Sequence, residues 1–140
     1  MNKRILKYAA LIMVSAVIFA GCSKNDIAAP KIILTEVGED NCKTAECGKE
    51  LHLEANIVAE GLIKSINIEI HQKTDGGKEI EQSYTSGKYI GIKNTVFHEH
   101  IDIPADMPTG EYHLHFTVAD KENRTATKEE QILIVEETNL

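Results

Sequence analysis

Residues 106–119 read DMPTGEYHLHFTVA, and this stretch decides the fold class. Its second half places apolar residues at every second position, at Tyr112, Leu114, Phe116 and Val118. Successive side chains of a β-strand point to opposite faces of a sheet, so this period predicts a strand with one buried and one solvated face. Pro108 and Gly110 come directly before the strand and mark its start.

The same alternation recurs along the chain from Lys31 onward, and turn signals such as Ser86-Gly87 separate the runs. The pattern predicts seven short strands and no helix. The predicted strands are Lys31–Val37, Glu50–Val58, Lys64–Gln72, Glu79–Tyr84, Thr95–Ile103, Glu111–Ala119 and Lys128–Val135. Several short strands separated by turns are typical of a β-sandwich.

Residues 106–112 resemble the tyrosine corner of immunoglobulin-like domains, in which a tyrosine near the start of the sixth strand hydrogen-bonds back to the preceding backbone. The resemblance assigns that role to Tyr112. The chain has no tryptophan, so the Cys-Trp-Cys core of antibody domains is absent. We therefore expect an all-β chain in which residues 31–140 form one immunoglobulin-like β-sandwich of about seven antiparallel strands, preceded by a signal peptide.

The first 22 residues predict export. A basic start with Lys3, Arg4 and Lys7 precedes an apolar run, and Cys22 follows a pair of small residues. This order is typical of a secretory signal, and the run is shorter than the roughly 20 residues of a membrane-spanning helix. The position of Cys22 makes the segment resemble a bacterial lipoprotein signal, in which the cysteine is acylated and becomes the first mature residue.

The resemblance implies a signal peptide at residues 1–21 and an acylated tether at residues 22–30. The lipid bilayer would then hold the chain through Cys22, because each buried methylene of an acyl chain contributes about 0.8 kcal/mol. We expect an outer-membrane lipoprotein of the cell envelope, facing either the periplasm or the cell surface.

The charge balance argues against nucleic acid as a partner. The chain has 15 Lys and Arg and 22 Asp and Glu, and the signal peptide holds three of the basic residues and no acidic one. The remaining 119 residues, enough for one domain, have a formal charge of −10. A negative chain without a basic cluster cannot neutralise phosphates.

Two further cysteines, Cys42 and Cys47, are separated by four residues. In an oxidising compartment this spacing predicts a disulfide, which would contribute roughly 2 kcal/mol by closing a short loop. A zinc site suits the pair less well, because no second cysteine pair completes the ligand set.

Six histidines lie on the predicted strands, at His52, His71, His98, His100, His113 and His115. Four of them form two His-x-His pairs. Residues two apart on a strand share a face and lie about 6.6 Å apart, so two imidazoles can reach one metal ion at about 2 Å each. The spacing therefore suits a metal site.

Immunoglobulin topology divides the histidines into two groups. In the constant-type arrangement the second and fifth strands are neighbours in one sheet. His52 would then lie beside His98 and His100 on one outer face, with Glu54 and Asp102 nearby.

The third, sixth and seventh strands of that arrangement form the other sheet. His71 would lie beside His113 and His115 on the opposite outer face, with Glu69 nearby. Three imidazoles and a carboxylate in each group suit Zn(II), Cu(II) or Ni(II).

Two other interpretations of the histidines stay open at this point. Outward positions on an acidic sheet hold polar residues by default, so the imidazoles could be solvated or paired with carboxylates. Histidine also titrates near neutral pH, so the groups could form a pH-sensitive surface for a partner.

Five segments of the sequence carry a resemblance to a known family. They are Pro30-Lys31-Ile32, Gly48-Lys49-Glu50-Leu51-His52-Leu53, Ile68-Glu69-Ile70-His71, Phe97-His98-Glu99-His100-Ile101-Asp102-Ile103-Pro104 and Gly110-Glu111-Tyr112-His113-Leu114. Together they resemble a family of short Bacteroidota lipoproteins that is defined only as a domain of unknown function. The resemblance covers about residues 30 to 135. It implies an exported, lipid-anchored, immunoglobulin-like domain, and it implies no activity.

The sequence therefore predicts a non-enzymatic, lipid-anchored binding module of the envelope, with a protein or a glycan as partner. The alternative is a metal-binding lipoprotein that uses the strand histidines, with Zn or Cu as the cofactor. An enzyme is disfavoured, because the chain has no His-Glu-x-x-His motif and no serine in a recognisable nucleophile turn. Flat sheet faces also lack the water-excluding cleft that a catalytic metal needs.

Overall fold

A computed structural model of the chain describes residues 26–74 and 76–139. The predicted signal peptide and Cys22 lie outside these residues. Among the described residues, no helix has the length and apolar character needed to cross a membrane.

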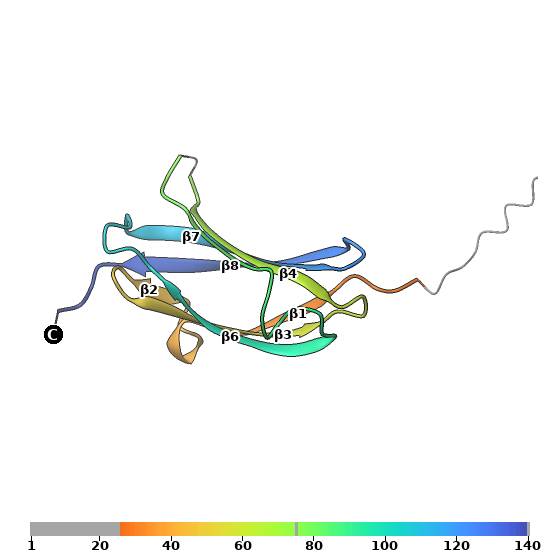
Figure 1. Ribbon diagram of the computed structural model, residues 1–140. Helices are drawn as coiled ribbons and strands as arrows, with labels where there is room; N and C mark the ends of the chain where they lie inside the picture. Colours follow the sequence, from red (N-terminus) through yellow and green to blue (C-terminus); the bar gives the residue numbers. More distant parts are fainter. Residues whose placement is uncertain (1–25, 75, 140) are drawn as a thin grey trace, which may run out of the picture.

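In the part of the chain that the structure describes, eight strands form two sheets that pack face to face (Figure 1). They are β1 (Lys31–Val37), β2 (Thr44–Glu46), β3 (Glu50–Val58), β4 (Ile63–Gln72), β5 (Ile80–Tyr84), β6 (Asn94–Asp102), β7 (Gly110–Asp120) and β8 (Thr125–Val135). A short 3-10 turn, η1 (Glu39–Asn41), follows β1. The all-β prediction is confirmed.

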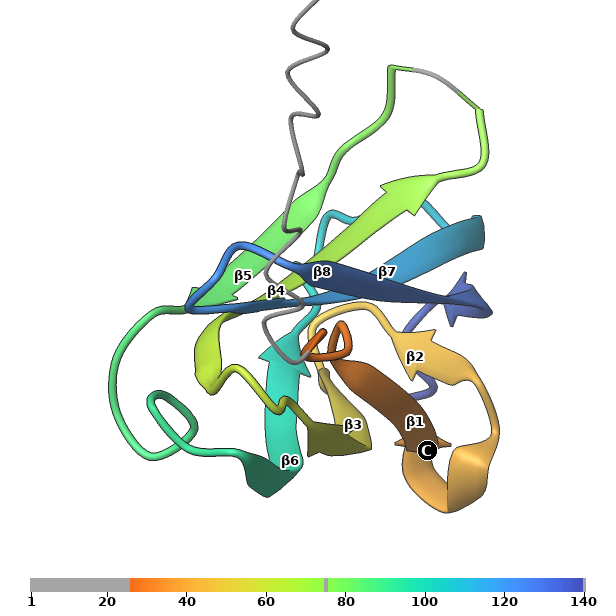
Figure 2. The ribbon, with the colours of Figure 1, turned by 90° about the vertical axis from the view of Figure 1, so that its right-hand side faces the viewer.

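The three-stranded sheet has the order β1-β3-β6, and the five-stranded sheet has the order β2-β8-β7-β4-β5 (Figure 2). The predicted neighbours are confirmed, since β3 pairs with β6 and β4 pairs with β7. The sequence prediction missed β2, and β2 also makes the sheet mixed because it runs parallel to β8. Three residues are too few to display a period of two, so the pattern carried no signal for this strand.

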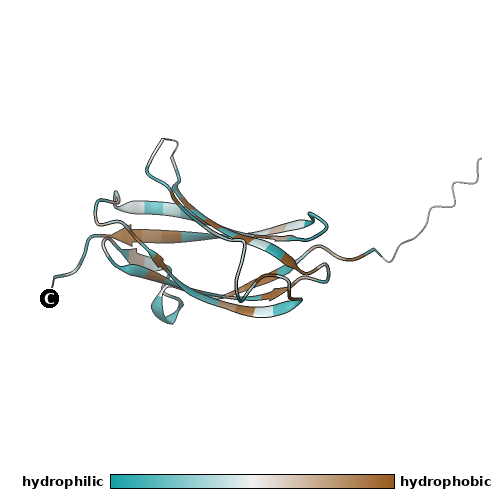
Figure 3. Ribbon diagram, in the orientation of Figure 1, coloured by the Kyte–Doolittle hydropathy of each residue, from teal (hydrophilic) through white to brown (hydrophobic). Residues whose placement is uncertain are grey.

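The core lies between the two sheets and is filled by the inward residues of each strand. Figure 3 shows hydrophobic and hydrophilic residues alternating along the strands. Leu53, Ile68, Phe97 and Phe116 are completely buried, and the rings of the two phenylalanines meet edge to face with centroids 5.1 Å apart. Each such side chain contributes about 1.5–3 kcal/mol through burial, so the alternation fixes which residues face outward.

The tyrosine corner predicted at Tyr112 is confirmed. The buried Tyr112 hydroxyl donates a hydrogen bond to the carbonyl oxygen of Pro108 at 2.6 Å. Burial raises the pKa of Tyr112, so the hydroxyl stays protonated and remains a donor. The contact ties the start of β7 to the loop before it.

The turn between β7 and β8 is held by the buried carboxylate of Asp120. Its Oδ1 accepts the backbone N–H groups of Glu122 and Arg124, both at 2.9 Å, and its Oδ2 accepts Arg124 Nε at 2.7 Å. Burial by itself would raise the pKa of Asp120, but the hydrogen bonds from Arg124 and from the backbone outweigh it and lower the pKa.

The predicted disulfide between Cys42 and Cys47 is not formed in this structure, in which both cysteines are free. Cys47 is buried and its thiol donates to the carbonyl oxygen of Met107 at 3.1 Å, whereas Cys42 is exposed with its thiol 3.6 Å from the carbonyl oxygen of Thr44. Strand β2 lies between the two cysteines and directs Cys47 inward together with Ala45. The sequence spacing did not reveal this strand.

Replacing Tyr112 with phenylalanine removes the donor and leaves the Pro108 carbonyl without this partner. We expect Tyr112→Phe to lower the free energy of unfolding by about 1–2 kcal/mol, measured by urea denaturation. Tyr84→Phe is the matched control, because no hydrogen bond of the Tyr84 hydroxyl occurs among the described residues; it should change stability by less than about 0.5 kcal/mol. Equal effects of the two substitutions would contradict the corner.

The lowered pKa of Asp120 makes a prediction about pH. A carboxyl whose pKa is lower when folded stabilises the fold above its ordinary pKa of 3.8, and this stabilisation is lost as pH falls through the folded value. Asp120→Asn places an N–H group against Arg124 Nε, so we expect the melting temperature at pH 7 to fall by roughly 5–10 °C.

The difference in melting temperature between wild type and Asp120→Asn should shrink as the pH is lowered below about 4. Glu122→Gln, an exposed substitution in the same turn, is the control and should follow the wild-type curve. A difference that stays constant from pH 7 to pH 2 would show that the charge of Asp120 is not the stabilising feature.

Candidate metal centre

All six histidines lie on outer faces of the sandwich, as the alternation predicts. His98 and His100 are exposed, and the other four are half-buried. The outer face of the three-stranded sheet carries His52, His98 and His100, and that of the five-stranded sheet carries His71, His113 and His115. We call these sets the first group and the second group.

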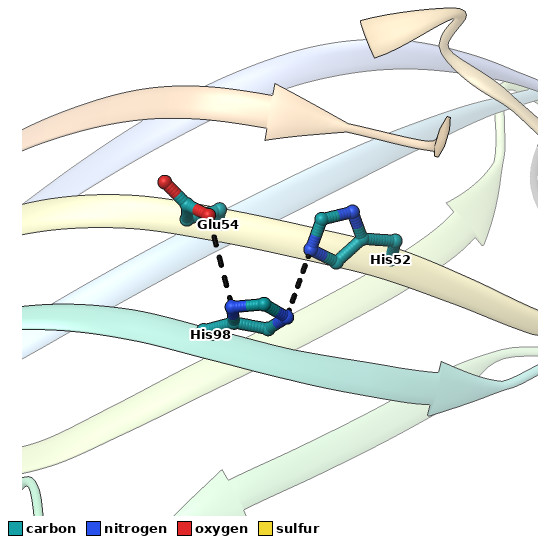
Figure 4. A group of neighbouring side chains, drawn as sticks. All are labelled: His52, Glu54 and His98. Atoms are coloured by element: carbon teal, nitrogen blue, oxygen red, sulfur yellow. Dashed lines mark hydrogen bonds and ion pairs between the residues drawn. The ribbon is translucent and has the colours of Figure 1, made fainter. Parts of the chain in front are cut away.

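In the first group the closest contact joins His52 and His98, whose Nε2 atoms lie 3.1 Å apart (Figure 4). Glu54 lies directly opposite His98 in the register of β3 and β6, and its Oε2 is 3.7 Å from His98 Nδ1. His52, His98 and Glu54 each offer one ligand atom, and these atoms lie within 4.8 Å of one another. The third imidazole, that of His100, lies opposite His52 with ring centroids 5.1 Å apart.

The rings of His52 and His98 are inclined to each other. Their planes differ by 46°. Their centroids lie 4.6 Å apart and their Nε2 atoms lie 3.1 Å apart, whereas rings in an end-to-end arrangement would have their centroids farther apart for the same distance between the nitrogens. The rings therefore do not meet end to end. Two imidazoles bound to one tetrahedral zinc at 2.0–2.1 Å place their nitrogens about 3.3 Å apart. The observed separation is close to this value.

Carboxylates face the other nitrogen of each ring in the first group. Glu36 Oε1 lies 3.4 Å from His52 Nδ1, Glu54 faces His98 Nδ1, and Glu50 Oε2 lies 3.6 Å from His100 Nδ1. A carboxylate beside Nδ1 favours hydrogen on that nitrogen, which leaves the Nε2 lone pair free to bind a metal.

Glu36 is a member of the first group that the sequence pattern did not predict. A bulge in β1 between Leu34 and Glu36 shifts the register and places Glu36 opposite Glu54. A period-of-two pattern cannot predict such an extra residue. Asp102, which was expected near the histidines, lies opposite Glu50, and among the described residues no contact joins its carboxylate to the three imidazoles.

In the second group the Nε2 atoms of His71 and His115 lie 2.8 Å apart. His71 Nδ1 is 2.9 Å from the carbonyl oxygen of Gln72, and His115 Nδ1 is 3.3 Å from Glu129 Oε1. His113 lies opposite His71 with ring centroids 5.6 Å apart.

The carboxylate that faces His115 comes from β8 and was missed by the sequence analysis. Glu129 lies opposite His115 on one side, and the predicted neighbour Glu69 lies opposite His115 on the other. Recognising Glu129 required the exact register of β7 and β8, which the predicted strand boundaries did not provide.

A pocket of about 550 Å³ opens beside the first group. His52 and His100 line one part of it, and Cys42, Glu46 and Glu50 are among the other residues that line it. The edge of the first group is therefore accessible to a small ligand.

Solved structures with a similar fold share little sequence with this chain. Two structures of OgpA from Akkermansia muciniphila, one wild type and one catalytically inactive in complex with an O-glycopeptide, match 74% of this chain and 28% of the OgpA chain, with TM-scores of 0.54 and 0.53 and 14% identity. The sporulation control protein Spo0M from Bacillus subtilis matches 77% of this chain and 50% of its own at a TM-score of 0.49 and 14% identity.

This chain spans about a quarter of the OgpA length, and the likeness concerns the fold alone. A search of curated proteins found no match. A family model, in contrast, matches residues 20–135 and so includes both histidine groups and the tyrosine corner. The chain therefore belongs to the family described as "Domain of unknown function (DUF4625)".

Proposed function

We propose that this protein is a non-enzymatic, lipid-anchored module of the cell envelope and that its ligand is a transition-metal ion, Zn(II) or Cu(II). The observation that carries the proposal is the pair of inclined imidazoles whose Nε2 atoms lie 3.1 Å apart, at His52 and His98. One ion about 2 Å from both nitrogens fits this geometry. Nitrogen ligands together with a carboxylate suit these two metals.

Charge on the same face supports a cation as the ligand. Glu36 lies directly opposite Glu54 across β1 and β3, and Glu50 lies directly opposite Asp102 across β3 and β6. Like charges in opposite positions of neighbouring strands are destabilising. A divalent ion at His52 and His98 would offset this repulsion, because it lies between the acidic pairs.

Glu54 is also held in place for a role at the site. Thr35 Oγ1 donates to Glu54 Oε1 at 3.1 Å, which leaves Oε2 facing His98. The carboxylate would either bind the ion or accept the Nδ1 hydrogen of His98, and both roles strengthen metal binding.

The exposure of the first group favours holding an ion over using it in catalysis. His98 and His100 are exposed on a sheet face, and Glu54 is half-buried. A catalytic metal needs an open coordination position in a site that excludes water. We therefore propose storage or delivery of the ion.

A protein partner is a second candidate, favoured by apolar residues on the same face. Ile33 and Val96 are 63% and 56% exposed, and both lie opposite Asn56, on β1 and β6 respectively. Exposed apolar side chains next to a ligand site favour a protein surface as the recipient of the ion.

The proposed anchor rests on the sequence of the N-terminus. Nine residues, 22–30, separate Cys22 from the start of β1 at Lys31. Fully extended, they span at most about 30 Å, so the domain would stay close to the bilayer. The described chain starts at the end of the sandwich opposite the C-terminus (Figure 1).

Metal binding is tested by titrating the full-length chain with Zn(II) and Cu(II) in a calorimeter. We expect one ion bound at the first group with a dissociation constant below about 100 µM, and a loss of affinity of at least tenfold in His98→Ala and in His52→Ala. His113→Ala, on the opposite face, is the matched control and should leave this site unchanged.

Circular dichroism of each variant would verify the fold, which outward substitutions should preserve. Fewer than about 0.1 ions per chain in the wild type, or equal affinity in His98→Ala and wild type, would reject the proposed ligand.

The anchor is tested by Cys22→Ser in the native host or in a host that acylates lipoproteins. We expect the variant to lose incorporation of labelled fatty acid and to move from the membrane fraction to the aqueous fraction, because acyl chains supply the attachment. Cys42→Ser is the control and should stay in the membrane fraction. Membrane retention of Cys22→Ser would contradict the proposed lipoprotein.

A further inference from the structure

Connecting segments from distant parts of the sequence close the end of the sandwich at which β1 begins (Figure 1). They are residues 59–62, 91–93 and 121–124. Backbone hydrogen bonds join them, because Ala59 N donates to the carbonyl oxygen of Lys93 at 2.7 Å and Lys121 N donates to that of Leu62 at 3.0 Å. The segments therefore form one continuous surface, which we call the tether end.

Apolar side chains are exposed on the tether end. Val58, Leu62 and Ile92 are 39%, 36% and 38% exposed. One comes from the last position of β3, one from the turn after it and one from the segment before β6. The set is distinct from Ile33 and Val96, which lie farther along the outer face of the three-stranded sheet. Exposed apolar side chains that gather on one surface mark a contact with a partner or a membrane.

Leu62 is kept exposed at a cost to the backbone. Its φ is 67°, in the left-handed region that is unfavourable for a bulky side chain and that glycine adopts freely. The glycine next to it, Gly61, has another purpose, since a Cβ there would lie 2.5 Å from side-chain atoms of Asp120 and Arg124. An unfavourable conformation at an exposed position points to a use for the side chain.

Basic side chains surround the apolar ones. They are Lys31, Lys64, Lys93, Lys121 and Arg124. Two of the five have carboxylate partners, which are Glu60 and Asp120. The other three, Lys31, Lys64 and Lys121, form no ion pair among the described residues. Their positive charge is therefore available to a ligand outside the domain.

The two ends of the sandwich differ in charge. On the tether end the five basic residues face the carboxylates of Glu60, Asp120 and Glu122. The described segments at the opposite end hold seven Asp and Glu and four Lys, in residues 38–49, 73–74, 76–79, 103–109 and 136–139. The sequence shows no basic cluster because the chain as a whole is acidic, and only the fold gathers these basic residues from four separate segments.

We propose that the tether end rests on the surface of the bilayer, with its apolar side chains among the lipid headgroups and its lysines against anionic groups of the lipids. The inference rests on the proposed anchor at Cys22. Residues 22–30 span at most about 30 Å and join Cys22 to β1, which begins at this end. The tether end is thus the part of the domain that the anchor holds nearest to the bilayer.

The combination of residue types fits this ligand. Apolar side chains gain from entering the headgroup region, and anionic lipids attract basic residues near the surface. Lysine can lay its alkyl stem along apolar surface while its ammonium group stays at the level of the phosphates.

The orientation keeps the first histidine group in water. Strands β3 and β6 run between the tether end and the opposite end of the sandwich. A domain that stands on its tether end therefore holds the outer face of the three-stranded sheet upright on the membrane, where ions in solution can reach His52 and His98.

The chain contains no tryptophan, so one introduced indole reports its own surroundings. Leu62→Trp and Ile92→Trp place the indole on the tether end. Leu133→Trp is the matched control, because Leu133 is an apolar residue of similar exposure, 44%, near the far end of β8. Each acylated protein is incorporated into vesicles of phosphatidylcholine and phosphatidylglycerol, with or without brominated acyl chains that quench nearby indole fluorescence.

We expect brominated lipid to lower the fluorescence of Leu62→Trp and Ile92→Trp at least about twofold and that of Leu133→Trp by less than about 10%. Replacing Lys93 and Lys121 with Gln in the Leu62→Trp protein should weaken the quenching, and vesicles without phosphatidylglycerol should do the same. The matched control replaces Lys73 and Lys78, at the opposite end, with Gln and should leave the quenching unchanged.

Flotation of the vesicles separates this inference from the proposed anchor. Protein that does not float with the vesicles contradicts the anchor, and the inference is lost with it. Protein that floats while Leu62→Trp and Ile92→Trp are quenched no more than Leu133→Trp retains the anchor and overturns the inference. Quenching that is equal with and without phosphatidylglycerol also overturns it, because the anionic headgroups then have no part in the contact.

Discussion

The alternation of side chains along a strand is the constraint on which the rest of this structure depends. A shift of one residue in register would move every inward side chain to the solvent face. Leu53, Phe97 and Phe116 are fully buried. Such a shift would expose their apolar surface to water and would lower the free energy of unfolding by several kcal/mol for each strand. The core therefore fixes the outward direction of the histidines more firmly than any contact among the histidines themselves.

Much of this fold could be predicted from the sequence because its signals are local. The bounds of β1 and β3 were predicted correctly, and Tyr112 was assigned its hydrogen bond from a turn and strand pattern of seven residues. Features set by the pairing of distant segments were missed. The strand β2, the bulge that brings in Glu36 and the position of Glu129 beside His115 all depend on register between strands.

In the candidate sites too, local features could be predicted from the sequence and features set by distant segments could not. The sequence predicted which histidines share a face, because that follows from alternation and sheet order. It treated the two groups as equivalent, since each contains one His-x-His pair and one isolated histidine. The structure distinguishes them through ring orientation, with an angle of 46° between planes in the His52–His98 pair and 9° in the His71–His115 pair. Ring orientation depends on the oxygen atoms beside each Nδ1, and all of these except the Gln72 carbonyl beside His71 come from other strands.

Placing such sites on outer faces separates binding from folding. The core is complete without the imidazoles, so the fold does not need a metal ion to form, unlike small zinc domains in which binding supplies the folding free energy. The acidic pair of Glu36 and Glu54 nevertheless repels across β1 and β3 in the absence of a cation. An ion held at His52 and His98 would relieve that repulsion, and the stability gained equals the free energy of binding at the prevailing ion concentration. A face of this kind would therefore respond to metal by becoming more stable while keeping the same architecture, as the proposed binding and release of an ion requires.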